Sequence, residues 1–117
     1  MAEPSRLSGR ARLAIQAPEH EVLLSVASVW EMAIKAAIGR LALVGFVDLR
    51  SFVAQQLAVT GFGVLDIRLE HALQSAGLPQ RHRDPFDRML IAQAQVDGLT
   101  LVSRDPAMRE CGVETLW

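Results

Sequence analysis

Short apolar runs alternate along the chain with longer segments in which apolar residues recur every three or four positions. The runs are typical of buried strands, and the longer segments are typical of amphipathic helices. We predict strands at 21–25, 64–67, 99–103 and 113–116, and helices at 5–17, 28–38, 48–59, 69–76, 84–97 and 105–110. The stretch 41–46 fits either an extended piece or a loop. Strands that alternate with helices predict an α/β fold with a mostly parallel sheet.

Several helix ends carry recognisable signals. Asp48 and Asp84 stand where an N-cap is expected, and Pro85 suits the first helical position after Asp84. Gly98 suits the C-terminal stop of the same helix. Ser28 and Glu31 have the spacing of a capping box, in which the glutamate accepts a hydrogen bond from the serine amide.

The composition narrows the class of protein. The chain has 117 residues, of which 50% are hydrophobic, with a net charge of −1. We therefore expect one domain spanning 1–117. No apolar run reaches about 18 residues and the start lacks a secretion signal, so we also expect no membrane association and a cytoplasmic location. A single cysteine, Cys111, excludes an internal disulfide and a cysteine-rich zinc site, and we interpret it as a small packed residue.

Three acids, Glu31, Asp87 and Asp105, fall in or just before the first turn of a predicted helix. Each has a structural explanation, as a capping residue or as an anion beside the positive end of a helix dipole. Asp87 precedes Ile91 and Ala94 by four and seven positions, so we expect it on the packed side of its helix. Acids that converge at the carboxyl ends of parallel strands require a hard cation such as Mg²⁺ or Mn²⁺ to offset their repulsion.

Cationic residues surround the acidic helix start. Arg81, His82, Arg83 and Arg88 fit either a solvated loop with one helix-surface arginine or contacts to a phosphate beside a metal. Lys35 likewise fits an ion pair with Glu31, four residues earlier, or a contact to the scissile phosphate.

Other candidate residues favour structural roles. Ser103 could orient a metal-bound water, but a strand-end hydroxyl bonded to backbone is the preferred interpretation. We predict that Trp30 belongs to the core rather than to a base-stacking surface. We interpret His20 and His71 as surface residues that ligate nothing.

Three ordered motifs then point to a family. Ser25-x-x-Ser28-x-Trp30-Glu31-x-x-x-Lys35, the segment from His82-Arg83-Asp84-Pro85-Phe86-Asp87-Arg88 to Ala94, and Val102-Ser103-Arg104-Asp105 together span most of the chain. In these motifs the sequence resembles PIN-domain ribonucleases, and within them the VapC-type toxins of bacterial toxin–antitoxin pairs.

The resemblance implies a fold, an activity and partners. The fold is a three-layer α/β/α domain. The activity is that of a Mg²⁺- or Mn²⁺-dependent endoribonuclease, inhibited by a cognate antitoxin whose tail fills the active site, and we also expect a homodimer. The second, third and fourth acids of the family's site map onto Glu31, Asp87 and Asp105. Asp84 accompanies them, with capping as its preferred role.

The sequence departs from the family at its start. The family begins with a short apolar strand that ends in aspartate, and residues 1–6 contain no such strand. The resemblance therefore implies that the first, central strand and the first catalytic aspartate are missing here. Neighbouring strands could close the gap, another chain could supply a strand, or the reading frame could begin further upstream, which is the explanation we favour.

Two functional hypotheses follow. The first is an RNA endonuclease that uses Glu31, Asp87 and Asp105 together with an aspartate outside this sequence. The second is an inactive PIN domain that still binds antitoxin or RNA. The RNA target is not readable from the sequence, because recognition of RNA depends on surface shape and loop contacts.

Overall fold

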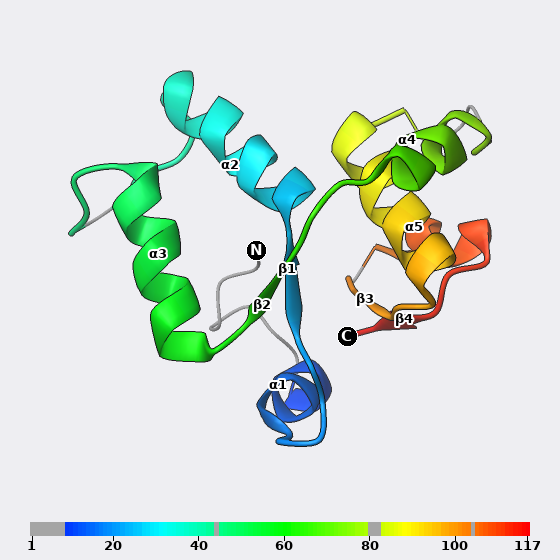
Figure 1. Cartoon of the computed structure of the whole chain (residues 1–117), viewed down its shortest axis with the longest axis horizontal. Coiled ribbons are helices and arrows are strands. Elements are labelled where there is room, and N and C mark those ends of the chain that lie inside the picture. Colours follow the sequence, from blue (N-terminus) through cyan, green and yellow to red (C-terminus); the bar gives the residue numbers. More distant parts are fainter. Residues whose placement is uncertain (1–8, 44, 80–82, 104) are drawn as a thin grey trace. The chain divides into compact units, whose positions relative to one another are not determined.

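The computed structural model describes residues 9–43, 45–79, 83–103 and 105–117 (Figure 1). Among them, the helices are α1 (Gly9–Gln16), α2 (Val26–Ala37), α3 (Leu49–Thr60), α4 (Leu69–Ala76) and α5 (Pro85–Asp97), followed by the 3-10 helix η2 (Pro106–Cys111). The strands are β1 (Leu23–Ser25), β2 (Gly63–Leu65), β3 (Leu101–Val102) and β4 (Thr115–Leu116). Helices and parallel strands alternate, so the predicted α/β class is confirmed.

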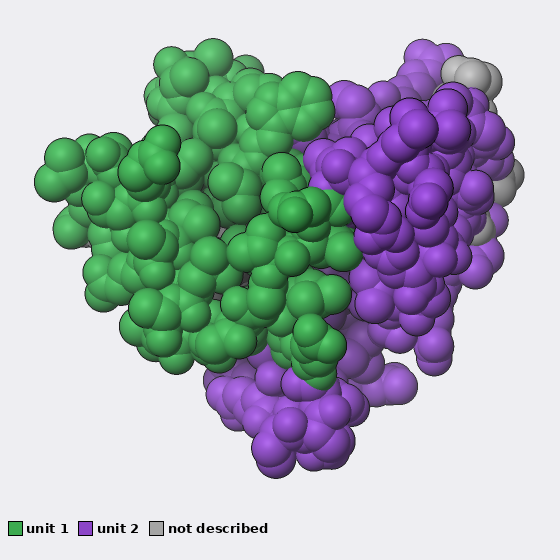
Figure 2. Space-filling model, viewed as in Figure 1, with its two compact units in different colours: residues 1, 21–66 green, residues 2–20, 67–117 purple. Residues whose placement is uncertain are grey.

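The chain divides into two compact units, which Figure 2 shows in different colours. Unit 1 contains residues 1 and 21–66, and unit 2 contains residues 2–20 and 67–117. The predicted single domain over 1–117 stays a prediction. The start of the predicted helix at 5–17 lies outside the described residues, and α1 confirms the remainder from Gly9.

Unit 1 is built on the parallel pair β1–β2, which α2 and α3 accompany (Figure 1). Leu23 pairs with Gly63, and Ser25 pairs with Leu65. Helix α3 begins where Asp48 predicts it, because the Asp48 carboxylate accepts a hydrogen bond of 2.8 Å from the Ser51 amide. Ser25 ends β1 and caps α2, so strand and helix meet without a connecting loop.

The strands are shorter than predicted, and the described ones form two separate pairs. Strand β3 has two residues where the apolar run predicts five, and it pairs in parallel with β4. The strand order is β1–β2 in one pair and β3–β4 in the other. The parallel direction is therefore confirmed, whereas a continuous sheet does not appear among the described strands. The expected absence of the family's first strand concerns residues 1–6, which lie outside the described part of the chain.

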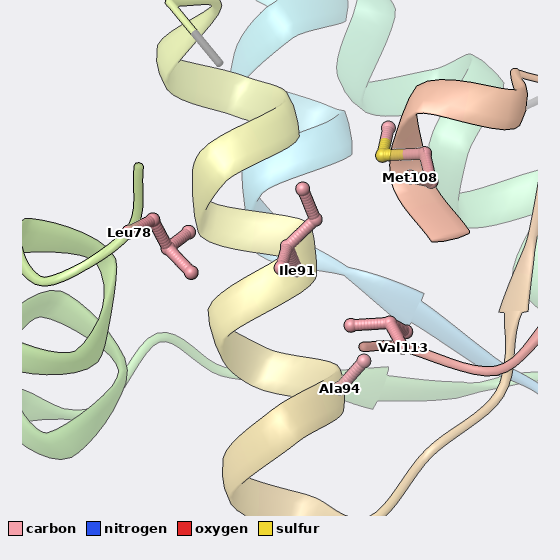
Figure 3. Packing of buried hydrophobic residues seen from close by; sticks show 5 residues of the cluster. All are labelled: Leu78, Ile91, Ala94, Met108 and Val113. Atoms are coloured by element: carbon pink, nitrogen blue, oxygen red, sulfur yellow. The ribbon is translucent and has the colours of Figure 1, made fainter. Parts of the chain in front are cut away.

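Unit 2 has its core along one face of α5 (Figure 3). Ile91 and Ala94 project from this face and are buried. Leu78, in the turn after α4, belongs to the same cluster, together with Met108 and Val113. Burying side chains of this size stabilises the fold by roughly 1.5–3 kcal/mol each, so these contacts anchor α5 firmly.

A polar cluster joins the start of α4 to the end of α5. His71 is completely buried, and its Nδ1 accepts a hydrogen bond of 3.0 Å from the Arg68 amide. This assigns the ring proton to Nε2, which lies 3.1 Å from Oδ2 of Asp97 and donates to it. The Arg68 guanidinium donates to both oxygens of the same carboxylate, at 2.5 and 3.4 Å.

The interpretation of His71 as a surface residue is therefore wrong. No residue near His71 in the sequence suggests a partner for it, because Asp97, which accepts its hydrogen bond, is 26 positions away. No local pattern signals such a contact. His20 is exposed, as predicted, and its Nδ1 lies 2.6 Å from the carbonyl oxygen of Ala14.

The Asp97 cluster makes the stability of the protein depend on pH. Hydrogen bonds from Arg68 hold the pKa of Asp97 below its usual value, and the hydrogen bond from His71 lowers it further. The stabilisation is fully present above the unfolded pKa of about 3.9 and is lost as the pH falls through the lower folded pKa. We expect the free energy of unfolding of Asp97→Asn to vary less between pH 6 and pH 3 than that of the wild type.

Urea unfolding at a series of pH values measures this difference. Glu19→Gln, on the exposed turn after α1, is the matched control and should follow the wild-type curve. Parallel curves for the wild type and Asp97→Asn would contradict the assigned role of Asp97.

Candidate active site

Helix α5 begins with the acidic motif Asp84-Pro85-Phe86-Asp87. Oδ1 of Asp84 accepts hydrogen bonds from the amides of Phe86 and Asp87, at 2.9 and 3.2 Å. Pro85 occupies the first turn, where its missing N–H costs nothing. The predicted capping role of Asp84 is confirmed, and its exposed carboxylate fixes the backbone that carries Asp87.

Asp87 lies in the first turn of α5 and is half-buried. It shares a helix face with Ile91 and Ala94, both of which are buried in the core of unit 2. The prediction that Asp87 lies on the packed side of its helix is therefore confirmed. Asp87 is the half-buried residue at the start of this buried face. The positive end of the helix dipole favours a carboxylate at this position.

Asp105 follows β3, and its backbone is held by a short turn. The Asp105 amide donates to Oγ of Ser103 at 3.1 Å, and the Asp105 carbonyl accepts from the Met108 amide at 3.2 Å. Ser103 is therefore a strand-end hydroxyl bonded to backbone, as predicted. The Asp105 side chain is exposed, so it is accessible to a ligand.

Glu31 lies in the middle of α2 rather than in its first turn. The helix begins at Val26, and Oγ of Ser25 caps it by accepting from the Ala27 amide at 3.1 Å. The predicted capping box of Ser28 with Glu31 is therefore wrong. Ser25 and Ser28 both precede apolar residues and both could cap the helix, and β1 ends at the earlier one.

The predicted ion pair on α2 is confirmed. Nζ of Lys35 lies 3.6 Å from Oε2 of Glu31, one helical turn apart. The two side chains are 51% and 32% exposed, so the pair is in contact with solvent and contributes little to stability. Either side chain can therefore leave the ion pair and bind a ligand instead, at a small cost in free energy.

The predicted phosphate-binding cations differ in their surroundings. Arg83 is exposed directly before the Asp84 cap. The guanidinium of Arg88 donates instead to carbonyl oxygens at the end of α4, at 2.6 Å to Ser75, 3.2 Å to Leu78 and 2.9 Å to Pro79. Arg88 thus completes the C-terminal end of α4. Arg81 and His82 lie outside the described residues.

The candidate acids are of the right type for a hard cation, because Mg²⁺ prefers carboxylate oxygens. Asp87 and Asp105 belong to unit 2, and Glu31 belongs to unit 1. Within the described part of the chain, no three His, Cys, Asp or Glu side chains gather closely enough to hold a metal ion. The carboxylates are suitable ligands for Mg²⁺, but the described residues do not bring a complete set of ligands together.

Unit 2 also contains a hollow of about 260 Å³ at the far end of α5. It is lined by Ala94, Gln95, Gly98, Leu99, Gly112, Val113 and Glu114. The hollow begins seven residues after Asp87, roughly 10 Å along the helix axis. None of the candidate acids lines it, so it is distinct from the candidate site.

Comparison with known families identifies the fold family. The sequence pattern of the PIN domain family matches residues 2–113. The chain belongs to the PIN domain family. Searches of curated proteins and of solved structures found no significant match.

Membership of the PIN domain family suggests what the candidate acids could do chemically. PIN domains are nucleases that generally depend on divalent metal ions, bind RNA and often have antitoxin partners. In this PIN domain, the matched region contains Glu31, Asp87 and Asp105. No helix in the described part of the chain is long and apolar enough to cross a membrane.

Sequence reasoning missed the exposure of Trp30. The side chain is 54% exposed, so the prediction that it belongs to the core is wrong. Helix α2 is apolar on nearly every side, and its one charged pair is Glu31 with Lys35. Periodicity therefore does not show which face packs, and the spacing of Trp30, Ile34 and Ile38 fits a buried or an exposed stripe equally well.

The position of Arg88 generates a testable prediction. Arg88→Met keeps the aliphatic stem but removes the hydrogen bonds to the end of α4. We expect the free energy of unfolding to fall by about 1.5–3 kcal/mol, since these are hydrogen bonds from a charged donor. Urea denaturation measures the change.

Arg83→Met is the matched control, because Arg83 is exposed five residues earlier. It should change stability by no more than about 0.5 kcal/mol. If Arg88→Met unfolds at the wild-type urea concentration, the guanidinium does not stabilise the α4–α5 pair.

Proposed function

We propose that this PIN domain is a metal-dependent endoribonuclease that hydrolyses RNA phosphodiester bonds and serves as the toxin of a type II toxin–antitoxin system. The observation that carries the proposal is the placement of Asp87. It is a half-buried carboxylate on a helix whose start is fixed by a separate capping acid, Asp84. The family match over residues 2–113 supports nuclease activity.

The proposed catalytic residues are Glu31, Asp87 and Asp105, whose carboxylates would hold Mg²⁺ or Mn²⁺. When bound, such an ion lowers the pKa of a coordinated water and offsets charge that develops on the phosphate. Asp87 supplies a carboxylate with a fixed backbone, and Asp105 supplies an exposed one after β3. Lys35 and Arg83 are the proposed phosphate contacts, since both are exposed.

Arg88 is a weaker candidate for a phosphate contact, because its guanidinium already binds the carbonyl groups at the end of α4. Ser103 acts through the turn that carries Asp105, where its hydroxyl oxygen accepts a hydrogen bond from the Asp105 amide. Both residues thus hold backbone in place, Arg88 at the end of α4 and Ser103 at the turn that carries Asp105.

The proposed partners are RNA, a cognate antitoxin and a second copy of the chain, in the cytoplasm. The motif resemblance to VapC-type toxins supports the antitoxin. Exposed apolar side chains on α4, Leu69 and Leu73, offer surface that a protein partner could cover.

The first test compares two acids of one motif. We expect Asp87→Asn to lower RNA cleavage by roughly 100-fold or more, because an amide cannot replace a charged ligand or proton acceptor. Asp84→Asn should retain cleavage, since asparagine caps helices as well as aspartate does. Cleavage of a labelled single-stranded RNA, with urea denaturation of both variants, measures the contrast.

Equal loss of cleavage in the two variants would assign catalysis to the motif as a whole rather than to Asp87. Wild-type cleavage in Asp87→Asn would overturn the proposal. Antitoxin or RNA binding by a wild-type chain that cleaves nothing with any divalent ion would instead establish an inactive binding module.

The second test removes the metal. We expect EDTA to abolish cleavage and an excess of Mg²⁺ or Mn²⁺ to restore it, while Ca²⁺ restores less because it holds its ligands in a looser geometry. Cleavage that persists in EDTA would contradict metal dependence.

A further inference from the structure

The side chain of Arg88 ties the first turn of α5 to the end of α4. Its Nη2 donates to the carbonyl oxygens of Ser75 and Leu78 at 2.6 and 3.2 Å, and its Nη1 donates to that of Pro79 at 2.9 Å. All four residues belong to unit 2, so the contact lies within one compact unit. The donor is charged, and hydrogen bonds from a charged donor are stronger than those between neutral groups.

Arg88 directly follows Asp87, the candidate catalytic acid. Successive residues of an α-helix lie about 100° apart around its axis, so a contact that fixes the direction of one side chain also fixes that of the next. The Asp84 carboxylate holds the Asp87 amide, and the Asp84 carbonyl accepts from the Arg88 amide at 3.0 Å. These backbone contacts fix the shape of the turn but not its position against α4.

Apolar packing does not fix the orientation of this turn either. Hydrophobic burial has no preferred direction, and the buried residues of α5 begin one turn after Asp87, at Ile91. Asp97 holds the opposite end of the helix through its contacts with Arg68 and His71. The directional contacts of Arg88 therefore determine how the first turn of α5 faces.

We propose that Arg88 is a positioning residue for the proposed reaction, which holds the Asp87 side chain in place, and that its guanidinium does not contact the RNA backbone. The inference rests on the proposed function, because it takes Asp87 as a catalytic acid. If the guanidinium left the end of α4 for a phosphate, it would release the turn that carries Asp87. Arg83, which is exposed five residues earlier, is the better placed cation for a phosphate.

The first measurement is amide hydrogen exchange, followed by NMR without added metal. We expect the amides of Phe86 and Asp87, which donate to Asp84, to exchange about tenfold faster in Arg88→Met, because the turn then opens locally more often. Asp97→Asn is the matched control. It weakens the contact of α5 with α4 at the opposite end and should leave these two amides at the wild-type rate.

The second measurement separates positioning from phosphate contact. A labelled RNA, titrated in EDTA at a series of salt concentrations, should bind Arg88→Met as tightly as it binds the wild type. Arg83→Met should bind more weakly, and the slope of its affinity against salt concentration, on logarithmic axes, should fall by about one, since one phosphate contact is lost.

The third measurement is cleavage of the same RNA with Mg²⁺ present. Arg88→Met should have a kcat lowered about tenfold and an unchanged KM, because a misplaced catalytic group slows the reaction without weakening substrate binding. Arg88→Lys should recover part of kcat, since an ammonium can still donate to the carbonyl groups but lacks the planar fork of a guanidinium.

Wild-type exchange rates at Phe86 and Asp87 in Arg88→Met would overturn the proposal. So would a weaker RNA affinity with a reduced salt dependence, as expected for Arg83→Met, because that pattern belongs to a phosphate contact. If the wild-type chain cleaves no RNA with any divalent ion, the proposed function fails, and the exchange and binding measurements still decide the role of Arg88.

Discussion

Unit 2 depends on the antiparallel contact between α4 and α5. Ile91 and Ala94 on the inner face of α5 are buried in the apolar core of the unit, and such burial stabilises the fold. Polar contacts fix the register at both ends, with Arg88 bound to the carbonyl end of α4 and Asp97 bound to Arg68 and His71 at its start. Since β3 and β4 have only two residues each, the sheet alone could not hold α5 in place.

The packing of α5 against α4 also positions Asp87, the candidate catalytic acid. The register of α5 places its first turn, and the Asp84 cap defines where the helix begins. Asp87 therefore sits on a rigid helical backbone, whereas Asp105 sits on a turn held by Ser103. The Asp-Pro-Phe-Asp motif combines a structural acid with a proposed catalytic one, and asparagine can replace the charge of the first without removing its hydrogen bonds.

Most helices were predictable because their signals are local. The bounds of α4 are those predicted, and Asp84 and Gly98 mark the two ends of α5. Strand lengths were not predictable, because a strand ends where its hydrogen-bonding neighbour ends. The whole run 99–103 has the pattern of a strand, yet β3 covers only Leu101 and Val102, opposite Thr115 and Leu116.

The candidate site was predictable in its residue types and less so in its surroundings. The sequence by itself determined the Asp84 cap, the face that Asp87 shares with Ile91, and the Glu31–Lys35 pair, because each depends on neighbours within one or two helical turns. Only the tertiary structure decided that His71 is buried against Asp97, that Arg88 binds the end of α4, and that Trp30 faces solvent. These depend on which side of a helix meets another element, and a helix as uniformly apolar as α2 does not encode that choice in its own pattern.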